Sequence, residues 1–550
     1  MTFGSATGRG SGAPAELKGG CPMSRQSLSL VGCLAACALV CTGVAGWAGS
    51  PAAAIVQGVA GDINADGHAD AAVGEPFDAD QAGAVHVFYG TVGGLVADAS
   101  GTARDDQLFT QDTPGVPGAG EPGDLFGYRS VTADFDADGR ADLAVAAPGE
   151  NANRGMVVVL YGSPGGVTTA GAQAFSENSL FGPGSAAVGE RFGEELASGD
   201  FNDDGFADLV SGAPGEIVSA GSGRAGGLAV IYGASTGLGT GATAAALITQ
   251  AGPMIPGVPE GGDAFGSALS SGDFNGNGVD DLAVGVPGED WDRGIVQVLP
   301  GRAASGLGAL ASSSFSQGTP GVAGGGEVGD TFGWAVAAGD VTGDARADLA
   351  IGTPGENGGT GEPRGQGAVS FLRGSGSGLT GTGSQFWSQD SPGVAGVAAD
   401  PDRFGESLVM AALDNGPLAD LAIGVPFDDV GPVSDAGAVN ILLGTASGLT
   451  ASGAGQRFHQ DTAGITGAAE FGDRFGRSLS APEIQTSGQG SLVIGVPLED
   501  IAGVADTGMF HQLATFEFGP NPFGSRTFHL NTPGVRGTPG GIDLFGFDVN

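Results

Sequence analysis

The chain has 550 residues and a formal net charge of −41, from 61 acidic and 20 basic residues. This excess of negative charge disfavours nucleic acids and anionic membranes as partners and favours cations. Glycine (109 residues) and proline (30 residues) are abundant, but the glycines recur at fixed places beside alternating apolar residues, which indicates many short strands and turns and argues against a low-complexity chain.

An apolar segment near the N-terminus is the first element. Arg25 supplies a short positive region and residues 28–44 an apolar run, which is the layout of a secretory signal. Ala48 and Ala54 are the candidate cleavage points, so residues 1–54 are expected to be a leader and the protein to be exported; Met23 is an alternative start. A membrane-spanning anchor is the other reading of the run, but the run is short and rich in small residues.

The cysteines all lie in this leader, at Cys21, Cys33, Cys37 and Cys41. The exported protein is therefore expected to have no disulfide, so something else must stabilise it. The stretches LVGC and LAAC, at residues 30–33 and 34–37, resemble bacterial lipoprotein cleavage boxes. We expect a secreted protein, with a lipid anchor as the one alternative that would attach it to a membrane.

Residues 55–550 contain a repeated unit. Residues 199–216 read GDFNDDGFADLVSGAPGE, and similar stretches begin at residues 61, 133, 272 and 339. Two weaker relatives, at 411 and 481, keep the apolar strand but lose most of the acids. This gives seven units with a period near 70 residues, which leaves room for four strands each.

One unit shows the expected order of elements. In the second unit we predict a first strand over 124–134, an Asp-rich loop, and a short strand in LAVAAPGE over 143–150. A β-branched third strand follows over 155–163, and a fourth over 173–179. Four antiparallel strands of this kind form one blade.

A Phe-Gly pair opens the first strand of most units. Where the unit is complete, the Phe lies eight residues before the first acid of the loop. At a fixed position it indicates a wedge that fills the gap between blades, with Gly allowing close backbone approach. The pairs begin at Phe126, Phe192, Phe265, Phe332, Phe404, Phe475 and Phe545.

Together, Phe-Gly, the Asp-rich loop and Gly-Ala-Pro resemble the FG-GAP repeats of the integrin alpha-subunit propeller and its bacterial relatives. The resemblance implies an all-β fold, a seven-bladed β-propeller with four-stranded antiparallel blades. The last Phe-Gly, at Phe545, has no loop after it, whereas the first loop, at Asp62, has no Phe-Gly before it. We therefore predict that the two ends of the propeller complete one blade and close the ring.

The loop pattern D-x-[DN]-x-[DN]-G-x-x-D predicts a calcium site. Side-chain oxygens at positions one, three, five and nine and the carbonyl oxygen at position seven can surround one hard cation, while Gly at six permits the turn. The predicted Ca²⁺ ligands are, loop by loop, Asp62, Asn64, Asp66, His68 and Asp70; Asp134, Asp136, Asp138, Arg140 and Asp142; Asp200, Asn202, Asp204, Phe206 and Asp208; Asp273, Asn275, Asn277, Val279 and Asp281; and Asp340, Thr342, Asp344, Arg346 and Asp348.

The loops differ in how well they keep this pattern. The fourth and fifth loops are expected to bind Ca²⁺ more weakly. The fourth has Asn275 and Asn277 between its two acids, and the fifth has Thr342 at position three and Ala345 in place of Gly. The sixth retains only Asp414 and Asp420, and neither it nor the seventh is expected to hold metal. The ions are expected to be structural and to replace the absent disulfides.

Ligand binding is expected on the face of the propeller opposite the Asp-rich loops, because the resemblance implies a ligand-binding surface there. Candidate residues in its loops are Arg224, Trp291, Arg293 and Arg364. The histidines are scattered, no H-E-x-x-H is present, and no G-x-S-x-G stands at an expected strand-to-helix turn. We predict a monomeric adhesion module that binds an extracellular protein or glycan. A structural matrix component and an enzyme acting on an extracellular polysaccharide are the alternatives.

Overall fold

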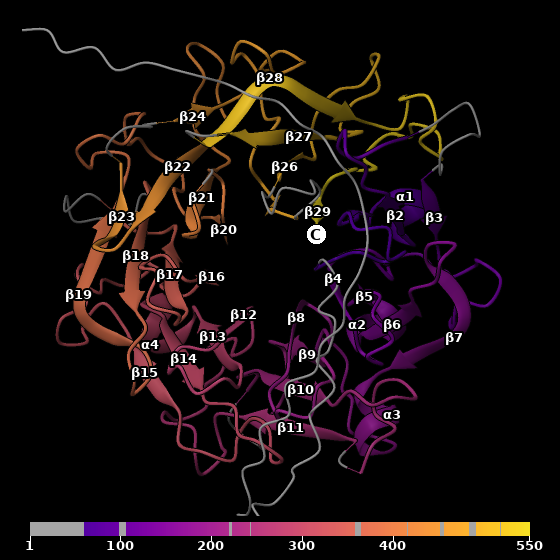
Figure 1. Cartoon of the computed structure of the whole chain (residues 1–550), viewed down its shortest axis with the longest axis vertical. Helices are drawn as coiled ribbons and strands as arrows, with labels where there is room; N and C mark the ends of the chain where they lie inside the picture. The colour runs from indigo at the N-terminus through magenta and orange to yellow at the C-terminus, as the bar shows by residue number, and fades with distance from the viewer. Residues whose placement is uncertain are drawn as a thin grey trace, which may run out of the picture. The chain divides into compact units, whose positions relative to one another are not determined.

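Seven antiparallel sheets surround a central channel in the described part of the computed structural model (Figure 1). The structure describes residues 60–550 except 98–105, 219–222, 243, 358–364, 415, 452–455, 483–490 and 517–518. The expected leader lies outside the described residues. Contacts between Cα atoms group residues 56–550 as one unit, and this unit is the propeller.

Each blade runs outward from an inner strand beside the channel. From the inner strand to the outer strand, blades one to four consist of β29 (Asp548–Val549), β1 (Ala71–Glu75), β2 (Ala84–Phe88) and β3 (Gln107–Phe109); β4 (Ser130–Ala133), β5 (Asp142–Ala147), β6 (Met156–Tyr161) and β7 (Thr168–Phe175); β8 (Glu195–Gly199), β9 (Asp208–Ala213), β10 (Gly227–Ile231) and β11 (Ala245–Thr249); and β12 (Ala268–Gly272), β13 (Asp281–Val286), β14 (Ile295–Leu299) and β15 (Ser313–Phe315).

Blades five to seven repeat this order. Their strands are β16 (Ala335–Gly339), β17 (Asp348–Thr353), β18 (Ala368–Arg373) and β19 (Thr380–Trp387); β20 (Ser407–Ala411), β21 (Asp420–Val425) and β22 (Ala438–Thr445), which pairs with both β23 (Gly448–Thr450) and β24 (Arg457–Phe458); and β25 (Leu479–Ser480), β26 (Ser491–Val496), β27 (Met509–Phe516) and β28 (Gly519–Phe528). The predicted all-β, seven-bladed fold is confirmed.

The first blade is built from both ends of the propeller. Val73 of β1 is paired with Val549 of β29, and Ala72 and Asn550 exchange two backbone hydrogen bonds of 2.9 Å each. Figure 1 shows the C-terminus beside β29 on the inner side of this blade. The predicted closure of the ring is confirmed.

The Phe of each Phe-Gly pair is a wedge between blades, as predicted. Phe126 is fully buried and packs in one cluster with Val85 of the first blade and Val145 of the second. Gly127 has φ of +88°, and a Cβ there would lie 2.1 Å from the carbonyl oxygen of Ala84. The pair precedes the strand, which begins at Ser130, later than the sequence indicated.

The predicted fourth strand of the second unit ends earlier than expected. β7 ends at Phe175, and Ser176 then caps a short helix, α3 (Glu177–Phe181), by accepting a hydrogen bond from Ser179 N. A hydroxyl placed to cap a helix outweighs weak strand propensity here. Within the described residues no helix is long and apolar enough to cross a membrane.

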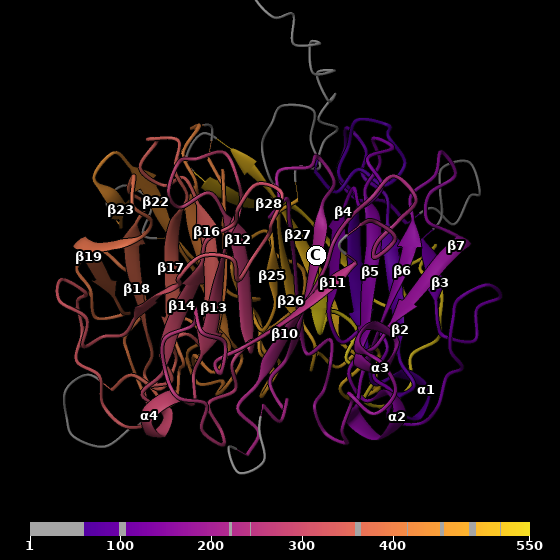
Figure 2. The ribbon, with the colours of Figure 1, turned by 90° about the horizontal axis from the view of Figure 1, so that it is seen from below.

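The propeller has two distinct faces. The Asp-loop face carries the Asp-rich loops between the inner and second strands. The helix face carries α1 (Asp78–Gln81), α2 (Glu150–Asn153) and α4 (Glu289–Asp292), each after its second strand, together with the connections into the next Phe-Gly (Figure 2). The antiparallel order of the strands separates these two sets of loops.

Candidate metal centres

The Asp-rich loops share one hydrogen-bonding pattern. In the third loop, the Asp200 carboxylate accepts hydrogen bonds from Asp204 N at 3.1 Å and Gly205 N at 2.9 Å. Asp208, the ninth residue, accepts from Phe201 N at 3.1 Å and from Gly233 N at 2.9 Å. The two acids that begin and end the motif are thus held in fixed positions by backbone donors.

The other four loops repeat these contacts. In each loop the first acid accepts hydrogen bonds from the backbone N–H groups of positions five and six. The ninth acid accepts hydrogen bonds from the backbone N–H of position two and from that of a residue at the end of the third strand. The first and ninth acids are Asp62 and Asp70, Asp134 and Asp142, Asp273 and Asp281, and Asp340 and Asp348.

Two positions of the loop have left-handed backbone. Position six was predicted to need Gly, and Gly205 there has φ of +87°; Ala345 takes the same conformation in the fifth loop, with φ of +63°. Position four is also left-handed, as at Ala65 with φ of +56° and Asp203 with φ of +57°. The sequence motif does not reveal the left-handed conformation at position four, because most of the loops have a residue other than glycine there.

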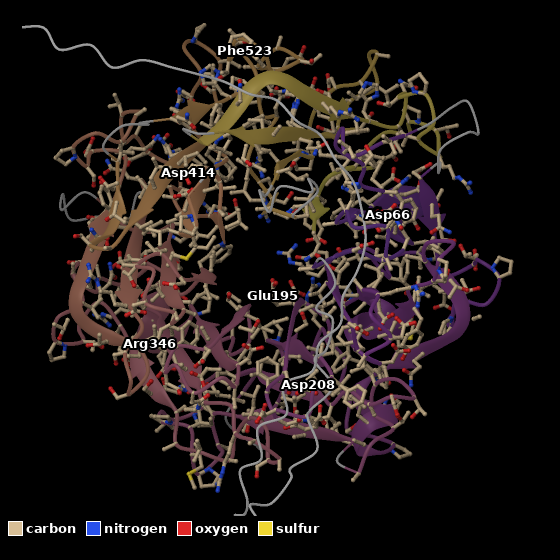
Figure 3. All side chains as sticks on the ribbon, viewed as in Figure 1. Asp66, Glu195, Asp208, Arg346, Asp414 and Phe523 are labelled. Carbon is tan, nitrogen blue, oxygen red and sulfur yellow. The ribbon has the colours of Figure 1, made fainter. Side chains whose placement is uncertain are left out.

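The residues at position seven were predicted to offer a carbonyl oxygen. Their N–H groups donate to the side-chain oxygen of position five in every complete loop, which orients both residues in the turn. The donors and acceptors are His68 and Asp66, Arg140 and Asp138, Phe206 and Asp204, Val279 and Asn277, and Arg346 and Asp344. Figure 3 shows Asp66, Asp208 and Arg346 in three separate blades of the ring.

The side-chain oxygens at position three of the loops indicate whether a cation fits there. Asn64 and Asn202 are buried, and neither Oδ1 atom has a hydrogen-bond partner among the described residues. In the second loop, one carboxylate oxygen each from Asp134, Asp136 and Asp142 lie within 4.8 Å of one another. A buried amide oxygen without a donor is costly, and a hard cation is a suitable partner for it. The donor set therefore fits Ca²⁺.

The ninth acids sit where a bare negative charge is unfavourable. Burial raises the pKa of Asp70 and Asp142 to about 8 and that of Asp208 to about 7, although backbone donors lower it in part. Neighbouring acids of the same loop, such as Asp62 beside Asp70, raise the pKa further. A cation bound among these carboxylates would instead lower their pKa values.

The fourth, fifth and sixth loops keep the backbone donors to the ninth acid. In the fourth loop Asn275 Nδ2 donates to Asp281 Oδ2 at 2.7 Å, and in the fifth Thr342 N donates to Asp348 Oδ2 at 3.0 Å. The sixth loop retains acids only at positions three and nine, Asp414 and Asp420, and Asp420 still accepts from Leu413 N at 3.0 Å and Gly444 N at 2.8 Å. The ninth acid therefore also ties each loop to its third strand.

Three of the four residues predicted for ligand binding, Arg224, Trp291 and Arg293, lie on the helix face, in the connections of two different blades. Trp291 is 81% exposed on α4. Arg293 donates to the carbonyl oxygens of Asp290 and Gly326, and Arg224 to those of Gly215 and Val188, so both arginines brace loops. Arg364 lies outside the described residues.

The central channel has a volume of about 1110 Å³, and its lining includes Tyr128, Trp334 and Phe547. Its acids are partly neutralised: Arg129 Nε lies 3.0 Å from Glu195 Oε2, and Arg129 Nη1 lies 3.7 Å from Asp548 Oδ1. Glu195 is seen beside the central opening in Figure 3. These pairs hold the inner strands together and do not resemble a free pair of catalytic acids.

A model of the FG-GAP repeat matches five segments of the chain, at residues 55–88, 126–160, 192–231, 265–299 and 332–372. Four of the five begin at the Phe of a Phe-Gly pair. They are the five units whose Asp-rich loops are complete or nearly so.

Two curated proteins are similar over part of the chain. Integrin alpha-PS5 of Drosophila melanogaster is 34% identical over 174 residues, 30% of this chain and 15% of that protein. Phosphatidylinositol-glycan-specific phospholipase D of Homo sapiens is 35% identical over 168 residues, 30% of this chain and 19% of that protein. The match spans less than a fifth of either relative.

Among solved structures, a rhamnogalacturonan lyase of Bacillus licheniformis covers 66% of this chain and 65% of that protein, with 13% identity and a TM-score of 0.32.

Proposed function

Because the chain carries FG-GAP repeats in a seven-bladed propeller similar to that of integrin alpha chains, we propose that it is a calcium-stabilised binding module that acts outside the cell as a monomer. The observation that carries the proposal is the partnerless, buried Oδ1 of Asn64 and Asn202, each in a loop whose other oxygens suit Ca²⁺. Extracellular calcium sites bind at about 10⁻⁴–10⁻³ M, so these loops would be filled outside a cell and largely empty inside one.

The helix face is the proposed ligand-binding surface. Exposed apolar side chains recur there: Trp291 on α4 is 81% exposed, and Phe471, four residues before a Phe-Gly, is 79% exposed. Val188 and Val328 hold the same place before Phe-Gly in two other blades and are about half exposed. Exposed aromatic and apolar side chains in these connections favour a protein partner over a glycan.

The first experiment counts metal on the purified protein and follows thermal unfolding with Ca²⁺ and with a chelator. We expect three to five ions per chain and a clearly higher Tm with Ca²⁺, since a ligand that binds only the folded state stabilises it. Protein without bound metal and with the same Tm under both conditions would refute the calcium role.

The second experiment screens calcium-loaded protein against arrays of extracellular proteins and of glycans. A protein ligand that is lost in Trp291→Ala and Phe471→Ala, and kept in Phe523→Ala, would support the helix face as the binding surface. Phe523 is a suitable control because it is 69% exposed but lies in β28. A glycan ligand insensitive to these changes would argue against it.

A further inference from the structure

A hydrogen bond between a glutamine and an acid recurs on the helix face of five blades. The glutamine follows the outer strand, and the acid lies 39 residues later, just after the second strand of the next blade. The pairs are Gln111 with Glu150 at 2.8 Å, Gln250 with Glu289 at 2.9 Å, Gln317 with Glu356 at 2.6 Å, Gln389 with Asp428 at 3.0 Å and Gln460 with Glu499 at 2.5 Å. In each pair a neutral amide donates to a buried or half-buried carboxylate.

After the outer strand of the second blade, a glutamate stands where these blades have glutamine. Glu177 precedes Glu216 by the same 39 residues, and Glu190, two residues before Phe192, completes a group of three acids. Glu177 and Glu190 are each 1% exposed and Glu216 is 7% exposed. One carboxylate oxygen from each lies within 4.8 Å of the other two.

Within the part of the chain that the structure describes, two oxygens of these glutamates have no donor. Glu177 Oε1 and Glu216 Oε2 are buried without a hydrogen-bond partner, whereas Glu190 Oε2 accepts from Ala187 N. Arg224 is a nearby cation, but its guanidinium donates to the carbonyl oxygens of Gly215 and Val188. Three buried carboxylates facing one another repel unless a positive charge lies between them.

The segments that carry these acids are held in place independently of the acids. Ser176 caps α3, whose first residue is Glu177. Asn178 Oδ1 accepts from Gly184 N at 2.8 Å and Ala186 N at 3.2 Å, which fixes the connection leading to Glu190. The oxygens therefore converge because the backbone places them, which is the condition for a preformed site.

We propose that Glu177, Glu190 and Glu216 bind a divalent cation, Ca²⁺, on the helix face. Calcium takes oxygen ligands at about 2.3–2.6 Å, so oxygens on opposite sides of one ion are about 4.6–5.2 Å apart. The spacing of these three oxygens fits within that limit. The site is separate from the Asp-rich loops and does not depend on whether they hold metal.

The alternative occupant is a proton. Burial raises the pKa of Glu177, and the charges of Glu216 and Glu190 raise it further. A protonated Glu177 could then donate to Glu216 as glutamine does in the other blades. The two occupants differ in their dependence on metal, so an experiment can separate them.

The test compares wild type with Glu177→Gln, which restores the residue of the other five blades and is expected to fold. Ions per chain are counted in the presence of excess Ca²⁺, and crystals soaked in Tb³⁺ are measured for anomalous scattering. Glu260→Gln, an exposed residue in the corresponding connection of the next blade, is the matched control. Glu177→Ala serves as a second variant that removes the oxygens.

We expect Glu177→Gln and Glu177→Ala each to bind one ion fewer than wild type, and Glu260→Gln to bind the same number. An anomalous peak should lie among the three glutamates in wild type and be absent in Glu177→Gln. The proposal is overturned if all four proteins bind equal numbers of ions and the wild type shows no peak there, whether or not the loops on the other face are filled. In that case Glu177 shares a proton with Glu216.

Discussion

Val549 is paired with Val73, 476 positions earlier in the chain, and this pairing completes the first blade. Phe545 lies just before it and is fully buried against Phe88 and Phe510, which come from the first and last blades. The closure of the ring therefore depends on a few residues that contact both blades.

Removal of residues 545–550 is expected to lower the Tm sharply, because it exposes the inner edge of β1 and removes the last wedge. Phe545→Ala alone should cost about 3–5 kcal/mol of unfolding free energy, as for other buried Phe residues. The check is thermal and denaturant unfolding, with the exposed Phe523→Ala as control. An unchanged melt after the deletion would mean that the ring is not closed by β29.

Asp208→Asn is expected to remove one calcium ion and its share of stability. With Kd of about 10⁻⁴–10⁻³ M, one site contributes about 1.4–2.7 kcal/mol at about 10 mM Ca²⁺. The measurement is the increase in Tm on adding Ca²⁺, since the variant also perturbs hydrogen bonds from Phe201 N and Gly233 N in the absence of metal. Asp203→Asn, at an exposed non-ligand position of the same loop, should show the wild-type increase.

The stability of the first blade is expected to fall as pH rises from about 6.5 to 8. His86 is fully buried between Asp106, 2.8 Å from its Nδ1, and Glu75, 3.1 Å from its Nε2. The hydrogen bonds and charges of these acids outweigh burial and raise the pKa of His86 to about 8. Burial raises the pKa of Glu75 to about 7, with a further contribution from Asp78.

The sign follows from proton binding. His86 has a higher pKa folded than unfolded, so its stabilisation is complete below pH 6.5 and is lost as pH rises through 8. The contribution is on the order of 2 kcal/mol. His86→Gln, which introduces the residue found at Gln297 in the fourth blade, should flatten this part of the stability–pH profile. A variant that keeps the wild-type slope would show that other groups cause it.

Gln460→Leu is expected to destabilise the seventh blade. The Gln460 amide donates to Glu499, which is 6% exposed, and leucine would leave this carboxylate without that donor at a cost of about 1–3 kcal/mol. The double variant Gln460→Leu, Glu499→Met should recover most of the loss, because no buried charge remains. Urea unfolding of the three proteins measures both effects, and equal stability of both variants would contradict this account.

Much of the architecture could be predicted from the sequence because it repeats. The Phe-Gly wedges, the seven blades and the closing strand follow from motifs whose order is legible along the chain. The geometry of the Asp-rich loops was also accessible, since Asp200 and Asp208 belong to a short local motif. Position four of the loop was missed, because left-handed Ala65 carries no local signal.

The contacts that were missed join segments far apart in the chain. His86 meets Asp106 through the pairing of strands, and Glu177 meets Glu216 across 39 residues. A signal for the second was present, because aligning the units places Glu177 where other blades have glutamine. It becomes informative only when the hydrogen bond between glutamine and acid is known.

The closing strand also affects how the chain folds at high concentration. Until β29 pairs with β1, the first blade has an open inner edge that can accept a strand from any copy of the chain. A second molecule's β29 matches this edge as well as the chain's own, so crowded refolding should yield domain-swapped oligomers at the expense of closed monomers. Refolding at low protein concentration favours pairing of β1 with β29 of the same molecule, because the effective concentration of that strand does not change on dilution.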